Sequence, residues 1–170
     1  MKPEVINIFA GFLRKGCIPQ TNLTGGVHGA GKEDAVAAEY ERIFQCWKFA
    51  ERAVSTTFKD AVTDALLAKI KTEDICPHGL HRAIYPISKP TSGIRKLLVD
   101  VAVWLWKGEY VGEWEENKDC AEFFFDVMRV LHKNRGIGVD SCEPPFDGKD
   151  GCAYHDHVME GTACYRTMFS

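Results

Sequence analysis

The sequence predicts an all-α fold, an array of about six helices that ends in an irregular segment with a candidate zinc site. In several separate segments between Pro3 and about Lys133, apolar residues recur every three or four positions, which is the period of a helix with one buried face. No stretch alternates apolar and polar residues with the period of two that is typical of a β-strand. After Asn134 the helical period stops, and Gly, Pro, Asp, Cys and His become frequent.

The first two helices are predicted on either side of a glycine-rich loop. Pro3 fits the first turn of a helix, and Gly16 can adopt the left-handed conformation that ends one. Residues 20–34 contain four glycines and no apolar period, so they are predicted to form a loop. The second helix is expected from about Ala35 to Val54. Its apolar face is Val36, Tyr40, Ile43, Phe44, Trp47 and Ala50, whereas Glu39, Glu41, Arg42 and Lys48 are expected to point elsewhere.

A third and a fourth helix follow after short breaks. The third begins near Thr57, which together with Asp60 resembles a capping box. Its apolar positions are Phe58, Val62, Ala65, Leu66 and Ile70. The fourth helix covers about residues 77–85 and ends at Pro86, because proline cannot continue the hydrogen-bond ladder.

The fifth and sixth helices complete the array. The fifth, from Ser92 to about Trp106, is apolar almost all round, which predicts a central place in the core. Its one acidic residue, Asp100, would need a partner when buried, and we expect it to cap another helix or to bind a distant arginine. The sixth helix covers about residues 119–133.

The composition disfavours nucleic-acid and membrane binding. The net charge is -3, and the 21 basic and 24 acidic residues are mixed, so no basic stripe is present. Residues 1–20 lack a secretory signal, and the longest apolar stretch, residues 97–106, is too short to cross a bilayer. The seven scattered cysteines favour buried thiols and a metal site over a disulfide framework. We expect a protein of the cytoplasm or the nucleus.

Four segments, taken in order, carry a family resemblance. EVINIFAGFLRKGCIP (4–19) is similar to FxxFxxWLYTGxxP, and YERIFQCWKFAERAVSTTFKDAVTDAL (40–66) is similar to a helix pair with an aromatic-x-x-Ala run. IYPISKPTSGIRKLLVDVAVWLW (84–106) is similar to YENTPEGSPLRRLLVDLYVW, and CAYHDH (152–157) with Cys164 is similar to a terminal C-x-Y-H-x-H element. These patterns resemble fungal BTB/POZ-domain proteins, from the second half of the domain onward.

The resemblance implies a non-catalytic module that binds another protein, as a scaffold or adaptor, in some members of the family for ubiquitin ligases. Residues 1–72 would be the C-terminal helices of the BTB/POZ domain, residues 73–134 the following helical region, and residues 135–170 a Cys/His-rich segment packed on the helices. Two features depart from the family pattern. FLRKG (12–16) replaces WLYTG, and Met1 falls where the family's domain is already half complete. Homodimerisation through the usual interface is therefore not carried over.

The strongest chemical signal is Cys152-x2-His155-x-His157-x6-Cys164. Two thiolates and two imidazoles form a tetrahedral donor set that suits Zn²⁺, and four protein ligands leave no position for water, as in structural sites. Cys142 is a spare ligand if one of the four fails. The alternative is that the histidines form local hydrogen bonds and the cysteines are incidental.

The same four residues are compatible with two other functions. In a zinc-dependent hydrolase, three of them would bind the metal, a water would complete the site, and Glu160 or Asp156 would act as general base. No H-x-E with P-C-x-x-C, the pattern of zinc deaminases, accompanies them. A nucleic-acid-binding zinc knot is disfavoured by the surrounding acidic residues, which are Asp147, Asp150, Asp156 and Glu160.

A second Cys/His group and two tryptophans are weaker candidates for a site. Cys76-x-His78-x2-His81 lies at a helix start, where the three side chains do not easily share a metal, so solvated or capping residues are expected. Trp106 and Trp114 flank two glycines, and an exposed aromatic there would be a candidate hot spot for a partner.

Gly26-x4-Gly31-Lys32 matches most of the phosphate-binding P-loop pattern. That site needs a strand before the loop and a Ser or Thr after the lysine. No strand is predicted here, and Glu33 stands where the hydroxyl should be, so we expect a loop that binds no phosphate.

Overall fold

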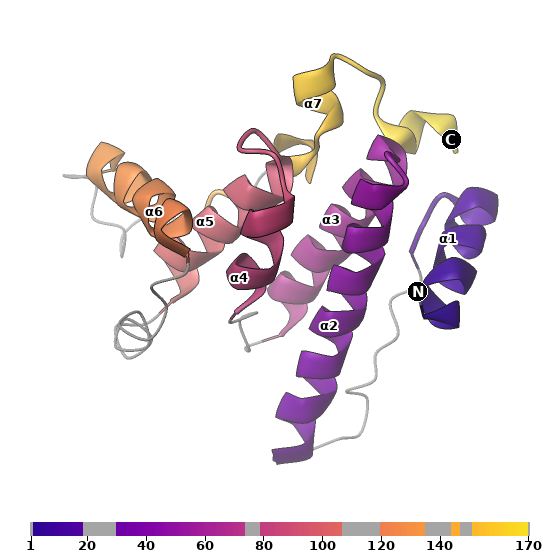
Figure 1. Ribbon diagram of the computed structural model, residues 1–170, viewed down its shortest axis with the longest axis horizontal. Coiled ribbons are helices and arrows are strands. Elements are labelled where there is room, and N and C mark those ends of the chain that lie inside the picture. The colour runs from indigo at the N-terminus through magenta and orange to yellow at the C-terminus, as the bar shows by residue number, and fades with distance from the viewer. Residues whose placement is uncertain are drawn as a thin grey trace.

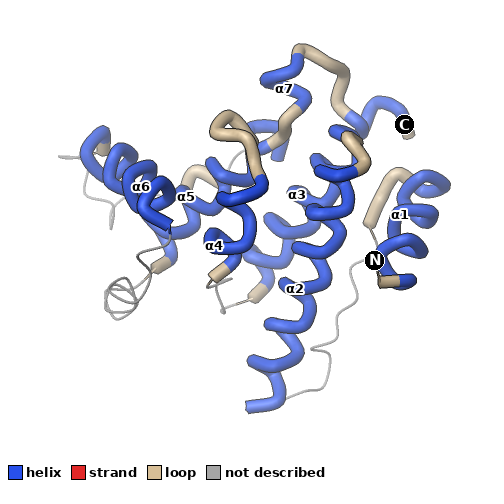
Figure 2. The backbone as a smooth tube through the Cα atoms, viewed as in Figure 1, coloured by secondary structure: helices blue, strands red, loops and turns tan. Residues whose placement is uncertain are grey.

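The computed structural model describes residues 2–18, 30–73, 79–106, 120–134, 144–146 and 151–169, which contain helices and loops but no strand (Figure 1, Figure 2). The α-helices in these ranges are α1 (Pro3–Lys15), α2 (Ala30–Arg52), α3 (Thr56–Thr72), α4 (Leu80–Ile84), α5 (Gly93–Leu105), α6 (Ala121–Lys133) and α7 (His157–Glu160). The 3-10 helices are η1 (Tyr85–Ile87), η5 (Gly151–Tyr154) and η6 (Tyr165–Met168). The predicted all-α class is confirmed. None of the described helices is long and apolar enough to cross a membrane.

Helix α1 forms where the sequence predicts it. Pro3 lies in the first turn, and Gly16 ends the helix with a φ of 67° while its N–H donates to Phe12 O at 2.8 Å. The buried face of α1 packs on α3 through aromatic rings. The centroids of Phe9 and Phe12 lie 4.9 and 5.2 Å from that of Phe58.

Helix α2 begins earlier than expected. It starts at Ala30, so Gly31 and Lys32 belong to the helix rather than to the predicted loop. Lys32 Nζ lies 3.4 Å from Glu73 Oε2, beside the end of α3. The lysine of the P-loop-like pattern therefore forms an ion pair between helices, and Gly26 lies outside the described residues.

The apolar face of α2 is buried as predicted, but Glu39 was placed on the wrong side. Its side chain is 2% exposed and forms an ion pair with Lys69 of α3, whose Nζ also lies 2.8 Å from Glu73 Oε1. Burial disfavours the charged form of Lys69, but the hydrogen bonds to both glutamates outweigh it and raise the pKa of this lysine. The buried carboxylate is thus compensated by a cation from the neighbouring helix.

The cap of α3 also differs from the prediction. Ser55 is the capping residue, because its Oγ accepts the N–H of Phe58 at 3.4 Å, and Thr57 lies inside the first turn. The remainder of α3 is buried on several faces, which places this helix between α2 and the C-terminal segment.

Helices α4, α5 and α6 form the other side of the molecule, with α5 buried along most of its length as predicted. His81 is 4% exposed and stacks on Phe123 of α6, with ring centroids 4.3 Å apart. The Trp106 ring is partly buried and lies 5.5 Å from that of His81. The expectation of a solvated His81 was wrong, because its ring is buried in this aromatic core, and Trp106 packs against the same core while staying only partly buried. The residues grouped with them in the sequence, Cys76, His78 and Trp114, lie outside the described part.

The C-terminal segment, residues 151–169, folds back across the ends of α3 and α5 and reaches α1 (Figure 1). Its last ring, Phe169, lies 5.5 Å from Phe12, and Tyr165 lies 5.9 Å from the same ring. Short helical turns connect these contacts, so the segment is more regular than expected. This arrangement brings the four predicted metal ligands onto α3.

Candidate metal centre

The structure brings together the four predicted ligands, Cys152, His155, His157 and Cys164, which we call the Cys/His cluster. One potential ligand atom from each lies within 4.8 Å of the other three. Cys152 lies in η5, His155 follows it, and His157 opens α7. Gly161 then ends α7 with a φ of 67°, and this turn returns the chain so that Cys164 faces the first three residues.

The two sulfur atoms of the cluster have the separation expected of two ligands to one metal ion. Cys152 Sγ and Cys164 Sγ lie 3.7 Å apart, and neither cysteine forms a disulfide. Two sulfurs at about 2.3 Å from a tetrahedral zinc ion would lie roughly 3.8 Å apart. A disulfide, in contrast, requires about 2.05 Å. The spacing therefore fits shared coordination of one ion.

Each histidine of the cluster uses one ring nitrogen for a carboxylate of α3. His155 Nε2 lies 2.8 Å from Asp64 Oδ1, and His157 Nδ1 lies 2.8 Å from Asp60 Oδ2. Both histidines are at least nine-tenths buried. The other nitrogen of His155, Nδ1, is buried and has no hydrogen-bond partner among the described residues. A carboxylate on one imidazole nitrogen and a metal on the other is the usual environment of a ligating histidine.

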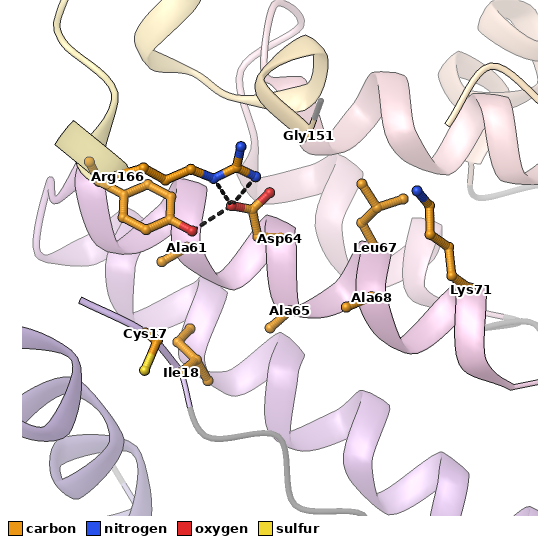
Figure 3. A pocket seen from close by; sticks show the side chains of 11 residues that line it. Cys17, Ile18, Ala61, Asp64, Ala65, Leu67, Ala68, Lys71, Gly151 and Arg166 are labelled. Carbon is orange, nitrogen blue, oxygen red and sulfur yellow. Dashed lines mark hydrogen bonds and ion pairs between the residues drawn. The ribbon is translucent and has the colours of Figure 1, made fainter. Parts of the chain in front are cut away.

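Asp64 is the most connected of these carboxylates. Besides His155, it accepts hydrogen bonds from the hydroxyl of Tyr165 and from Arg166, whose Nη2 lies 2.9 Å from Oδ2. Burial opposes ionisation of Asp64, but the hydrogen bonds from His155 and Tyr165, with the charge of Arg166, outweigh it and hold its pKa below the ordinary value. Figure 3 shows Asp64 extending from α3 toward Arg166 at the edge of a pocket.

Asp60 binds the backbone of the segment as well as its side chain. Its Oδ1 accepts the N–H of Asp156 at 2.7 Å, and its Oδ2 accepts the N–H of His157 at 3.3 Å. The backbone and the imidazole of His157 are thus oriented by the same carboxylate. Asp60 and Asp64 are one helical turn apart, so α3 presents both on one face.

Asp156, between the two histidines, attaches the cluster to α5. Its Oδ1 accepts the N–H of Gly93 at 2.6 Å and the hydroxyl of Ser92 at 3.0 Å. The carboxylate of Asp156 thus caps the start of α5 from a distant part of the chain. Its Oδ2 lies 2.7 Å from Lys59 Nζ. A Cβ atom at Gly93 would lie 2.0 Å from Tyr154 O, so only glycine permits this close approach.

The buried carboxylate of α5 also finds its partner in the C-terminal segment. The hydroxyl of Tyr154 donates to Asp100 Oδ2 at 2.9 Å. The sequence predicts that a buried Asp100 needs a partner, and Tyr154 is one such partner, in place of the helix cap or arginine that we expected to find there. Burial, followed by the charge of Asp100, strongly raises the pKa of the tyrosine, so its hydroxyl stays protonated and donates.

The sequence identified the four cluster residues but not the carboxylates around them. Asp60 was interpreted only as part of a cap, and Asp64 was not singled out. The one available signal was their spacing of four, which places both carboxylates on one face of a helix. The spare ligand Cys142 lies outside the described residues.

No family model matches the chain, and no curated protein or solved structure matches it. The BTB/POZ resemblance therefore stays a prediction from the four quoted motifs. The chemistry of the cluster is inferred from its own geometry.

Proposed function

We propose that the chain is a non-catalytic protein-interaction module, BTB/POZ-like and scaffold- or adaptor-like, whose C-terminal segment is fixed by a structural zinc ion. We place it in the cytoplasm or the nucleus, with another protein as its partner. The observation that carries this proposal is the set of four ligand atoms within 4.8 Å, two of them on imidazoles held by the carboxylates of α3.

The donor set favours zinc and a closed site. Two thiolates and two imidazoles are the ligands of many structural zinc sites, whereas magnesium and calcium prefer oxygen ligands. When all four residues bind, no coordination position is left for a water molecule. The role of the metal would be to join the segment that carries Cys164 to the part held on α3.

The hydrolase alternative requires a free general base, and both of its candidates are occupied. Asp156 is 7% exposed and binds Gly93, Ser92 and Lys59. Glu160 accepts a hydrogen bond from Thr56 Oγ1 at 2.8 Å. Carboxylates engaged in this way support a structural centre over a catalytic one.

Exposed apolar side chains support the interaction role. Phe125 and Met128 lie three positions apart on one face of α6 and are 63% and 56% exposed. Large apolar side chains that gather on a surface are typical of contact sites for other proteins.

Native mass spectrometry of the purified chain tests the proposal. We expect one zinc per chain in the wild type and in Cys17→Ser, which alters an exposed cysteine outside the cluster, and none in Cys152→Ser. A folded, helical protein that contains no metal would refute the zinc site. The same spectra report the mass of the assembly, which tests whether the chain dimerises.

Cobalt substitution separates the structural centre from the hydrolase. A closed site should give the visible spectrum of a tetrahedral S2N2 complex, and added azide should leave that spectrum unchanged. A change on addition of azide would reveal an exchangeable position and would favour the enzyme.

A further inference from the structure

Cys152 and Cys164 combine three properties that the other described cysteines lack together. Their sulfur atoms are only 3.7 Å apart, and both side chains are partly exposed. A cation is also present, because Arg166 Nη1 lies 3.9 Å from Cys152 Sγ. Exposure and a neighbouring positive charge are typical of cysteines that react with oxidants.

The remaining thiols of the described part serve as a contrast. Cys46 and Cys120 are buried at 2% and 4% exposure, and burial raises the pKa of both. Buried thiols in apolar surroundings are inert. Cys17 is exposed and lines a pocket with Arg166, but its sulfur is not one of the four clustered ligand atoms.

We propose that Cys152 and Cys164 form a redox pair, which a peroxide joins in a disulfide with release of the bound metal. The inference rests on the proposed metal site and adds a regulatory modification to it. The cluster would hold the C-terminal segment in the reduced protein and lose its ion on oxidation.

The reaction balances with the peroxide as the only oxidant. One thiolate attacks a peroxide oxygen, the O–O bond breaks, and a sulfenic acid forms as the leaving hydroxide takes a proton to become water. The second thiolate then attacks the sulfenic sulfur, the S–S bond forms, and the S–O bond breaks with loss of a second water after protonation. Two electrons pass from the sulfurs to the peroxide.

Disulfide formation removes two of the four ligands at once. The sulfurs must approach from 3.7 Å to about 2.05 Å, and neither then carries the negative charge of a thiolate ligand. Only His155 and His157 remain, and two neutral imidazoles bind zinc far more weakly than the complete set. Metal release therefore accompanies oxidation.

The test uses the full chain loaded with zinc and treated with hydrogen peroxide. Trypsin cleaves after Lys149 and Arg166, so both cysteines lie in one peptide, residues 150–166. We expect this peptide to lose two hydrogens while the whole equivalent of zinc appears in solution, measured with a colorimetric chelator. A thiol reductant with added zinc should reverse both changes.

Controls identify the residues involved. Cys17→Ser should respond like the wild type, whereas Cys164→Ser should lose the cross-link and instead trap a sulfenic acid that dimedone labels on Cys152. The peptides with Cys46 and Cys120 should stay unmodified, which shows that the protein remains folded.

Three outcomes would change these conclusions. Addition of oxygen to the 150–166 peptide without a cross-link would overturn the redox pair, as would retention of the zinc by a cross-linked protein. Zinc content is measured before peroxide is added, so failure of the metal site is recorded separately. A metal-free protein that still forms the cross-link would refute metal release but retain the redox pair.

Discussion

Single residues outside the Cys/His cluster decide how its ligands are oriented. The four candidate ligands lie within residues 152–164, but the direction of each imidazole is fixed by a carboxylate more than ninety positions earlier in the chain. A hydrogen bond from an imidazole to a carboxylate raises the basicity of the ligating nitrogen. Asp60 and Asp64 are therefore part of the centre, although neither would touch the metal.

Replacement of Asp64 by asparagine should weaken metal binding without removing a ligand. The amide is neutral, so it holds the His155 imidazole less firmly, and we expect about a 10- to 100-fold loss of zinc affinity. Competition with a chelator of known affinity measures the change. Asp126→Asn is the control, because Asp126 lies on α6 and binds Tyr85 and Arg129, not a residue of the Cys/His cluster. Equal affinities for the wild type and Asp64→Asn would contradict this role.

Cys46 makes stability depend on pH in the alkaline range. Burial, only partly offset by Arg42, raises the pKa of its thiol from 9.0 to about 11. As the pH rises, the unfolded chain releases this proton before the folded protein does. The contribution of the thiol to the free energy of unfolding is therefore complete below pH 9.0 and is lost as the pH approaches the folded-state pKa of about 11. By about pH 10.5 the wild type should lose roughly 2 kcal/mol relative to Cys46→Ala.

Urea unfolding of the wild type and Cys46→Ala at several pH values measures this effect. The tyrosines and lysines that titrate in the same range are common to both proteins, so their contributions cancel in the difference. A difference in unfolding free energy that is constant from pH 8 upward would show that the thiol is not buried in the folded protein.

At the scale of elements, the sequence predicted the helices better than their ends and their charged contacts. The spacing of apolar residues was sufficient to predict helices α1, α2 and α5, because each of them buries one face or most of its surface in the core. The start of α2 was missed because glycines 29 and 31 argue for a loop. Glu39 was misplaced because its partner, Lys69, comes from another helix and no local pattern links the two.

The candidate site was likewise predicted only in part: its ligands were found from the sequence, but the contacts that hold them were not. The spacing of Cys152, His155, His157 and Cys164 was readable, since the chemistry of the donors is local in sequence. The contacts that attach these residues to α3 and α5 depend on tertiary packing. The need for glycine at position 93 likewise follows only from the approach of Tyr154.

Two glycine-to-alanine substitutions in helices should therefore have opposite effects. Gly93→Ala forces a Cβ atom into Tyr154 O, at 2.0 Å, and should cost about 2–3 kcal/mol as the segment is pushed from α5. Gly11→Ala in α1 meets nothing within 4 Å and should stabilise the protein by about 0.5–1 kcal/mol through helix propensity. Chemical denaturation of both variants checks the signs. Destabilisation by Gly11→Ala, or none by Gly93→Ala, would contradict the packing of α1 or of the segment.

At the scale of the whole molecule, the C-terminal segment joins helices that are distant in sequence. Tyr165 and Phe169 contact Phe12 of α1, the cluster histidines bind α3, and Asp156 caps α5. Between α7 and η6, residues 161–163 are exposed. A metal ion held by Cys164 and the earlier ligands would close this exposed turn and link its two ends.

Global stability should consequently depend on the concentration of free zinc. An ion that binds only the folded chain stabilises it by RT ln(1 + [Zn]/Kd), which is about 4 kcal/mol at a thousand times Kd. For a chain of 170 residues this corresponds to a rise in Tm of roughly 10 °C. Thermal unfolding in chelator-buffered zinc should show Tm rising with the logarithm of free zinc in the wild type and in Cys17→Ser. Cys152→Ser and Cys164→Ser should give a flat response. A wild-type Tm that does not depend on zinc would mean that the four donors, although close together, are not joined by the ion.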